Sequence, residues 1–267
     1  MPKNKSNQME ITFYKYEGTG NDFVMIDNRN LYFPQNNTEL ISRICDRRFG
    51  VGADGLILLN PSENADFTMV YYNADGREGT MCGNGGRCIV AFAKALKIIK
   101  NKTTFNAIDG LHFATVENKM VKLQMIDVKN IEIYPEYCFL NTGSPHHVQI
   151  VKNINEYDVF TNGKNIRNGA PYFKEGTNVN FVEAVNDNVF RVRTYERGVE
   201  NETLACGTGV TAVAIAMYEQ KLVMANRINL LTEGGKLEVS FEKIDKTFKN
   251  VFLKGPANFV FKGSFNS

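Results

Sequence analysis

Two stretches of the 267-residue sequence dominate the prediction of its fold: CGNGGRCIVAFAKAL at residues 82–96 and CGTGVTAVAIAMYEQ at residues 206–220. Each opens with the pattern C-G-x-G and continues as a segment that is apolar nearly all round. A helix of that kind is buried, so we expect each to begin directly after its pattern and to lie inside a wrap of strands. The second stretch follows the first by almost half the chain length, which indicates an internal duplication.

Strand signals dominate the rest of the chain. One further helix is predicted at residues 38–47, with Thr38 as its N-cap. Three short segments are rich in β-branched or aromatic residues and bounded by turn formers: residues 67–72, 189–195 and 236–242.

A second internal sequence similarity supports the duplication. Residues 18–24, GTGNDFV, match residues 176–182, GTNVNFV, at four of seven places. We expect two halves, residues 1–126 and 127–267, with the last strand free to return to the N-terminal half.

Composition excludes several classes of protein. Lys and Arg total 31 against 29 acidic residues, and no concentrated basic face of the kind that binds nucleic acid stands out. The polar N-terminus lacks the apolar stretch of a secretion signal, and no apolar run reaches the ~20 residues that cross a bilayer. We expect a cytoplasmic protein without a membrane partner. Five cysteines, an odd number, do not suggest a disulfide framework.

Other ligand motifs fail on context or spacing. Residues 50–55 fit G-x-G-x-x-G, but the predicted helix precedes them and a strand follows, the reverse of a dinucleotide site, so we expect a loop. The Cys and His spacings do not match structural zinc sites, and we expect neither a metal nor a cofactor.

The two C-G-x-G turns carry the chemistry. The first N–H groups of a helix have no partner within it, and the helix dipole adds positive potential there. A cysteine at that point has its thiolate stabilised, which can lower a thiol pKa from ~8.5 to ~3.5–7.5. The same N–H groups can hold a carboxylate. Two such turns around one amino acid predict inversion at Cα, with Cys82 and Cys206 as base and acid and the carboxylate held by four residues: Gly83, Asn84, Gly207 and Thr208.

The chain resembles the diaminopimelate epimerase family over nearly its whole length. Six segments carry the resemblance, in the family's order: GTGNDF (18–23), DRRFGVGADG (46–55), YNADGREGTMCGNGGRC (72–88), GSPH (143–146), EGTNVNFV (175–182) and YERGVENETLACGTG (195–209). The resemblance implies an α+β fold of two pseudo-symmetric halves, each with mostly antiparallel strands wrapped around a central helix, and a site in the cleft between them. It also implies a homodimer that interconverts LL- and meso-diaminopimelate for lysine and cell-wall precursor biosynthesis.

The resemblance also implies roles for further residues. His146 and Glu196 match residues that tune the cysteines, and Glu196 with Arg197 would grasp the distal amino and carboxylate groups. The remaining matches to substrate-binding residues are Asn21, Asn73 and Asn178. Two positions depart from the pattern of many members: Ser144 stands in place of Asn, and Gly55 in place of the Gln that some members have.

Two rival functions remain open at this point. A proline or hydroxyproline racemase uses the same two-cysteine mechanism, although its first cysteine turn usually carries His where this chain has Asn84. A redox or ligand-binding protein could instead join Cys82 and Cys206 in a disulfide. Reducing agent separates these cases, because it restores an epimerase and disables a disulfide-dependent binder.

Overall fold

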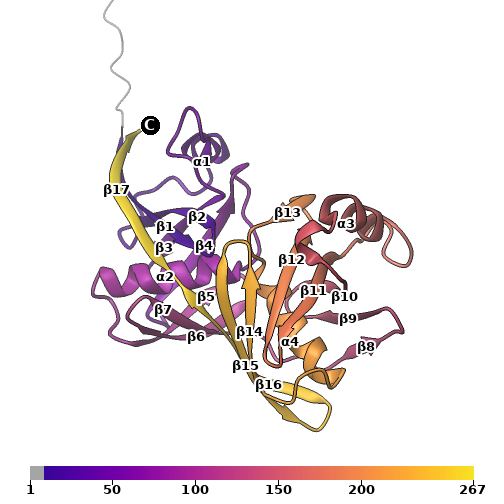
Figure 1. Cartoon of the computed structure of the whole chain (residues 1–267). Helices are drawn as coiled ribbons and strands as arrows, with labels where there is room; N and C mark the ends of the chain where they lie inside the picture. Colours follow the sequence, from indigo (N-terminus) through magenta and orange to yellow (C-terminus); the bar gives the residue numbers. More distant parts are fainter. Residues whose placement is uncertain (1–8) are drawn as a thin grey trace, which may run out of the picture. The chain divides into compact units, whose positions relative to one another are not determined.

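The computed structural model describes residues 9–267, which divide into two compact units (Figure 1). One unit contains residues up to Val121 together with Ala257–Ser267, and the other is Lys122–Pro256. The C-terminal strand β17 (Asn258–Asn266) pairs antiparallel with β1 (Glu10–Gly18), and Figure 1 shows the yellow end of the chain alongside the indigo start. The end of the chain therefore belongs with the first unit.

The first unit is a sheet with two helices. Its strands pair in the order β17-β1-β2-β3-β4-β5-β6, antiparallel except for the parallel pairs β2–β3 and β4–β5. The two parallel connections contain α1 (Thr38–Cys45) and α2 (Gly83–Ala95). The other strands are β2 (Asn21–Asp27), β3 (Gly55–Asn60), β4 (Phe67–Asn73), β5 (Lys102–Ala107) and β6 (Gly110–Glu117), and β7 (Met120–Gln124) runs across the division between the units.

The second unit repeats this plan. Its strands pair in the order β8-β9-β10-β11-β12-β14-β15-β16, and the parallel pairs are β10–β11 and β12–β14. The parallel connections contain α3 (Val159–Asn168) and α4 (Gly207–Glu219). The strands are β8 (Ile131–Ile133), β9 (Tyr137–Asn141), β10 (Pro145–Ile150), β11 (Asn178–Asn186), β12 (Val189–Glu196), β13 (Asn201–Thr203), β14 (Arg227–Thr232), β15 (Gly235–Ile244) and β16 (Thr247–Pro256), with a short 3₁₀ helix at Ile154–Glu156.

The shared order of pairings shows how the halves correspond. In both units the connection between the first two parallel strands contains a short helix. A hairpin follows, and the connection between the next two parallel strands contains the central helix. Helix α2 therefore corresponds to α4, and β3 to β11. The expected match between residues 18–24 and 176–182 is therefore wrong. The first segment spans the turn from β1 to β2, whereas the second leads into β11, the counterpart of β3. Short Gly- and Asn-containing turns resemble one another without being equivalent.

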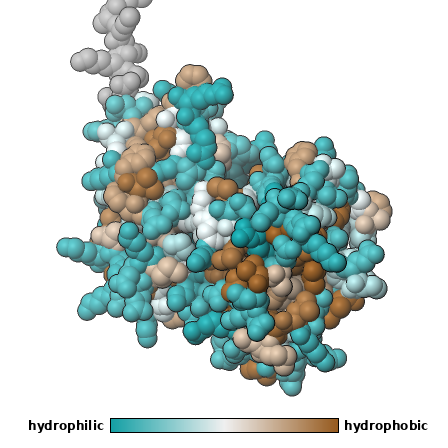
Figure 2. Space-filling view, in the orientation of Figure 1, coloured by the Kyte–Doolittle hydropathy of each residue, from teal (hydrophilic) through white to brown (hydrophobic). Residues whose placement is uncertain are grey.

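The central helices are buried as their composition predicts. In α4 every residue from Gly209 to Met217 is buried, and the helix packs in a core with apolar residues of β10, β11, β12, β14, β15 and β16. A separate core lies under β1, β2, β3 and α1. The face in Figure 2 is mostly hydrophilic, with hydrophobic residues in small groups. No helix in residues 9–267 is long and apolar enough to cross a membrane.

Helix starts differ from the predictions in three places. Asn37, not Thr38, caps α1, because its side-chain oxygen accepts from the N–H of Leu40 at 3.0 Å. Both central helices begin inside the C-G-x-G pattern, directly after Cys82 and Cys206, which act as N-caps in extended conformation. The loop at residues 50–55 is confirmed, and β3 starts at its last residue.

Helix α3 was not predicted, because its sequence VFTNGKNIRN contains poor helix formers. Asp158 caps it by accepting from Thr161 at 3.0 Å. Gly163 lets it approach β12, since a Cβ there would lie 2.4 Å from that of Tyr195.

Candidate active-site turns

The first cysteine turn joins β4 to α2. Cys82 is half-buried and precedes the helix with φ −103° and ψ 120°, and its carbonyl accepts from the N–H of Gly86 at 2.7 Å. Gly83 and Asn84 are the first two helical residues, and both are buried. The backbone N–H groups at this end of the helix lie beside the sulfur-bearing residue, as an anion site requires.

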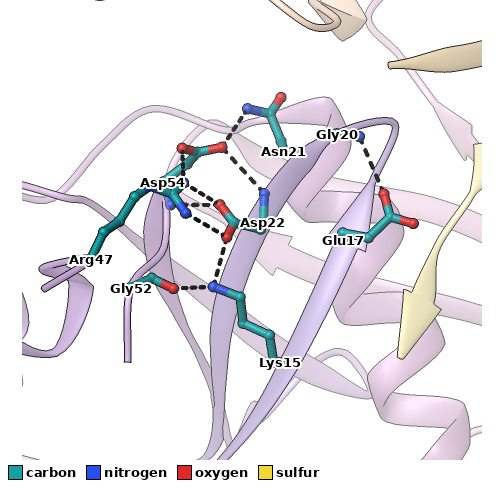
Figure 3. A network of polar contacts seen from close by, with 8 residues as sticks. All are labelled: Lys15, Glu17, Gly20, Asn21, Asp22, Arg47, Gly52 and Asp54. Carbon is teal, nitrogen blue, oxygen red and sulfur yellow. Dashed lines mark hydrogen bonds and ion pairs between the residues drawn. The ribbon is translucent and has the colours of Figure 1, made fainter. Parts of the chain in front are cut away.

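Asn21 and Asn84 are joined side chain to side chain. The Asn84 amide donates to Asn21 Oδ1 at 2.5 Å, and the Asn21 amide donates to Asp54 Oδ2 at 3.0 Å. Figure 3 shows Asn21 at the edge of a charged network that includes Asp54 and Arg47. The predicted substrate residue Asn21 is thus fixed from both sides.

The charged network holds the β1–β2 hairpin against the loop before β3. Asp22 accepts from Arg47 at 2.7 Å and forms an ion pair with Lys15 at 2.7 Å, and Lys15 also donates to the Gly52 carbonyl (Figure 3). Burial would raise the pKa of Asp22, but the hydrogen bonds and charges of Arg47 and Lys15 outweigh it and lower the pKa to about 2. Asp22 therefore stays ionised at neutral pH and anchors the hairpin that presents Asn21.

Arg87 is a buried cation in the second turn of α2, and the sequence analysis did not single it out. Its side chain is 0% exposed and donates to Thr19 Oγ1 at 2.9 Å. Burial lowers the pKa of this guanidinium, while the sulfurs of Cys88 and Cys82 act in the opposite sense. The available signal was an arginine in the middle of a helix whose other polar side chains, Asn84 and Lys94, lie near its two ends.

Asn73 and Gly55 face each other across β3 and β4. Asn73 is exposed at the end of its strand, where its backbone N–H donates to the Arg77 carbonyl at 2.9 Å. A Cβ at Gly55 would lie 2.5 Å from both the Tyr71 ring and the Tyr72 carbonyl oxygen. This close packing explains why Gly, rather than a larger residue, stands at this departure from the family pattern.

The second cysteine turn starts α4. Cys206 is 7% exposed, and its sulfur lies 3.5 Å from Thr208 Oγ1. The carbonyl of Thr208 accepts from Thr142 Oγ1 at 2.8 Å, which ties the turn to the β9–β10 connection. The turn thus places a thiol, a hydroxyl and the first helical N–H groups in one place.

His146 lies beside this turn on β10. It is fully buried, with Nε2 3.1 Å from Ser144 Oγ and Nδ1 3.1 Å from the Asn180 amide nitrogen. Burial, and then the charge of Arg197, lower the pKa of His146 to about 3. The ring is therefore neutral at pH 7. Asn180, which links the ring to β11, was also missed by the sequence analysis.

The remaining predicted residues lie near one another at the start of β11 and the end of β12. The Asn178 amide donates to Ser144 Oγ and to the Pro145 carbonyl, both at 3.1 Å, and its oxygen accepts from the Arg197 N–H at 2.9 Å. Glu196 is partly buried and accepts from Thr203 Oγ1 at 3.0 Å. The Arg197 side chain is exposed and donates to the Glu175 carbonyl at 2.9 Å.

The predicted residues thus fall into two groups. The first unit holds Cys82, Gly83, Asn84, Asn21 and Asn73, and the second holds His146, Asn178, Glu196, Arg197, Cys206, Gly207 and Thr208. Within residues 9–267, no group of three His, Cys, Asp or Glu side chains has the arrangement of a metal site.

Comparison with known sequences shows which family the chain belongs to. The sequence model described as diaminopimelate epimerase matches residues 13–129 and 138–260. The chain belongs to the diaminopimelate epimerase family. A diaminopimelate epimerase of Flavobacterium psychrophilum is 59% identical, covering 94% of this chain and 99% of that one. One from Chlorobaculum tepidum is 42% identical, with 92% and 98% covered.

Solved structures with little sequence similarity share the fold. A Bacillus anthracis phenazine biosynthesis protein of the PhzF family superimposes with a TM-score of 0.77 at 14% identity, covering 96% of this chain and 99% of that one. A probable proline racemase of Agrobacterium radiobacter gives 0.68 at 15% identity, with 95% and 92% covered. The predicted α+β fold of two similar halves is therefore confirmed.

The buried histidines predict a loss of stability in acid. Burial also lowers the pKa of His147 to about 4. Between pH 6.5 and these lowered values the unfolded chain binds more protons than the folded one, so stability falls as pH falls. We expect His147→Gln to reduce the slope of unfolding free energy against pH by about 1 kcal/mol per unit near pH 5, as measured by urea unfolding. An unchanged slope would contradict the neutral buried ring.

The third residue after each cysteine is a helical glycine, Gly85 or Gly209, and replacing these two glycines by Ala should change the stability of the protein to different extents. A Cβ at Gly209 would lie 2.4 Å from Asn180 Oδ1, which Thr194 holds at 3.0 Å, whereas a Cβ at Gly85 would meet the tip of Ile57 at 2.8 Å. We expect Gly209→Ala to destabilise by roughly 1–3 kcal/mol and Gly85→Ala, the matched control, by less. Equal unfolding midpoints for the two variants would show that Asn180 is not rigidly held.

Proposed function

We propose that this protein interconverts LL- and meso-diaminopimelate by moving a proton at one Cα between two cysteines, without a cofactor. The observation that carries this proposal is the repeated turn. Each of two equivalent central helices starts directly after a cysteine, Cys82 in one unit and Cys206 in the other. Family membership supplies the substrate.

The proposed reaction has two proton transfers. The thiolate of one cysteine removes the α-proton, and the thiol of the other delivers a proton to the opposite face of the same carbon. The first sulfur ends as thiol and the second as thiolate, so charge balances and the roles reverse in the opposite direction. A thiolate is a stronger base than an ordinary carboxylate, because its reference pKa of ~8.5 exceeds ~4.

In this proposal the reacting carboxylate is held by the first N–H groups of both helices. Gly83 and Asn84 supply them at Cys82, and Gly207 and Thr208 at Cys206. When the α-proton leaves, negative charge spreads onto this carboxylate, and preoriented N–H groups stabilise it without reorganisation. The positive end of each helix dipole acts in the same direction.

The distal end of the substrate would be held by Glu196 and Arg197. A guanidinium can give a carboxylate two parallel hydrogen bonds, and a carboxylate can accept from an ammonium group. Asn21, Asn73 and Asn178 would contribute amide contacts. Asn178 donates to Ser144 and Pro145 and accepts from the Arg197 backbone, so it would also position Arg197 for the distal end of the substrate. His146, neutral at pH 7, would tune Cys206 by hydrogen bonding rather than by charge.

Deuterium exchange tests the proposal. Purified protein in D₂O with reductant and a metal chelator should incorporate deuterium at Cα of diaminopimelate and not of proline, as measured by NMR. Cys82→Ala and Cys206→Ala should each lose at least ~10²-fold in turnover, since each removes an acid–base group. Cys138→Ala, a buried cysteine of the second unit, is the control and should retain activity. Activity that survives either active-site change would refute the assigned roles.

We further propose a cytoplasmic homodimer, as the family resemblance implies. Light scattering of the purified protein should give a molar mass twice that of the single chain at micromolar concentration. A mass equal to one chain over the whole concentration range would contradict the dimer and leave the chemistry of each turn unaffected.

A further inference from the structure

Ser144 lies at the centre of a hydrogen-bond cluster in the second unit, at the position where the family pattern leads us to expect Asn. Its Oγ is 3.1 Å from His146 Nε2, 3.3 Å from Thr208 Oγ1 and 3.1 Å from the Asn178 amide nitrogen. Thr208 Oγ1 in turn lies 3.5 Å from the sulfur of Cys206. One serine hydroxyl therefore connects a buried imidazole to the hydroxyl that contacts the thiol.

The direction of these hydrogen bonds is set from Asn180. Its amide nitrogen donates to the His147 carbonyl at 2.9 Å, and its amide oxygen lies 3.0 Å from the Thr194 hydroxyl. Since a carbonyl oxygen can only accept, this contact fixes which end of the amide carries the hydrogens. The same nitrogen lies 3.1 Å from His146 Nδ1, so Nδ1 is the acceptor. In a neutral ring the proton must then be on Nε2.

The proton on Nε2 sets the direction of the remaining hydrogen bonds between His146 and Cys206. His146 Nε2–H and the Asn178 amide both donate to Ser144 Oγ, which uses both of its lone pairs. The Ser144 proton is left to point at Thr208 Oγ1, and the Thr208 hydroxyl can then donate to Cys206 Sγ. Every donor in the sequence Asn180, His146, Ser144, Thr208 thus points toward the sulfur.

We propose that Ser144 is a positioning residue, which holds the Thr208 hydroxyl as a donor to Cys206 and so stabilises its thiolate through a directed chain from His146. No proton travels along this chain. The proton that Cys206 gains or loses is exchanged with the substrate carbon, and the hydroxyls keep their own. The inference rests on the proposed function only in taking Cys206 as a reacting thiol.

The first unit stabilises its cysteine differently, which provides an internal control. Asn84 stands at the position of Thr208; its amide donates to Asn21 Oδ1, and its amide oxygen accepts from the Thr19 hydroxyl at 3.4 Å, which in turn accepts from Arg87. The buried cation Arg87 stands where α4 has the neutral Thr211. Both Arg87 and Thr211 are fully buried, and Thr211 donates to the Gly207 carbonyl at 2.9 Å. A change at Ser144 should therefore leave Cys82 unaffected.

The test is the alkylation rate of each cysteine by iodoacetamide, followed peptide by peptide by mass spectrometry from pH 5 to 10. Only the thiolate reacts, so the rate at low pH reports the thiolate fraction. In Ser144→Ala we expect Cys206 to react about threefold to tenfold more slowly at pH 7, since the donor keeps its place but loses its orientation. Its pH profile should move upward, with the Cys82 profile unchanged. Ser144→Thr, which keeps the hydroxyl, should restore the wild-type profile.

Thr208→Val removes the last donor outright and should slow Cys206 by roughly tenfold or more at pH 7. This variant carries the test if Ser144→Ala does not fold. An unshifted Cys206 profile in either folded variant, or an equal shift at Cys82, would overturn the proposal. Alkylation needs no substrate, so this result is independent of the exchange assay. A wild-type protein that exchanges no α-proton would refute the function but not the hydrogen-bond chain.

Discussion

The proposed chemistry of this protein depends on a helix that begins immediately after a cysteine. In both units the residue before the first helical turn carries the thiol, and the chain enters in extended conformation at Cys82 and Cys206. The first N–H groups of the helix, which have no partner within the helix itself, and the positive end of its dipole both favour an anion at this end. Thiolate and substrate carboxylate are both anions, so one element of secondary structure can stabilise both.

Burying the central helix in a wrap of strands holds this turn in place. Helix α4 is apolar on all sides, and its core packing leaves little freedom at the end that carries Cys206. The two units support their turns with different chemistry. A buried guanidinium, Arg87, lies in the second turn of α2, whereas neutral hydroxyl and imidazole groups lie beside the start of α4. Duplication has conserved the helix start, while the supporting side chains differ.

Sequence alone predicted the parts of this structure that local pattern determines. The two apolar helices, the loop at residues 50–55 and strands β4, β12 and β15 follow from composition and periodicity. Helix α3 could not be found in this way, because Asp158 and packing against Tyr195 compensate for its weak propensity. Arg87 and Asn180 were missed for a related reason. Both lie in segments that carry the family resemblance, but their importance arises from burial and from partners distant in sequence, which these segments do not reveal.

The central claim, that two separate thiols act on one carbon, is tested most directly by the position of isotope early in the reaction. LL-diaminopimelate should be incubated with the protein in D₂O, the reaction stopped at low conversion, and both stereoisomers separated and analysed by mass spectrometry. The account predicts deuterium at Cα of the meso product and almost none in the remaining LL-isomer, because the sulfur that removes the proton is not the one that delivers it. Equal labelling of both isomers would mean that a single base serves both faces, and would contradict the account.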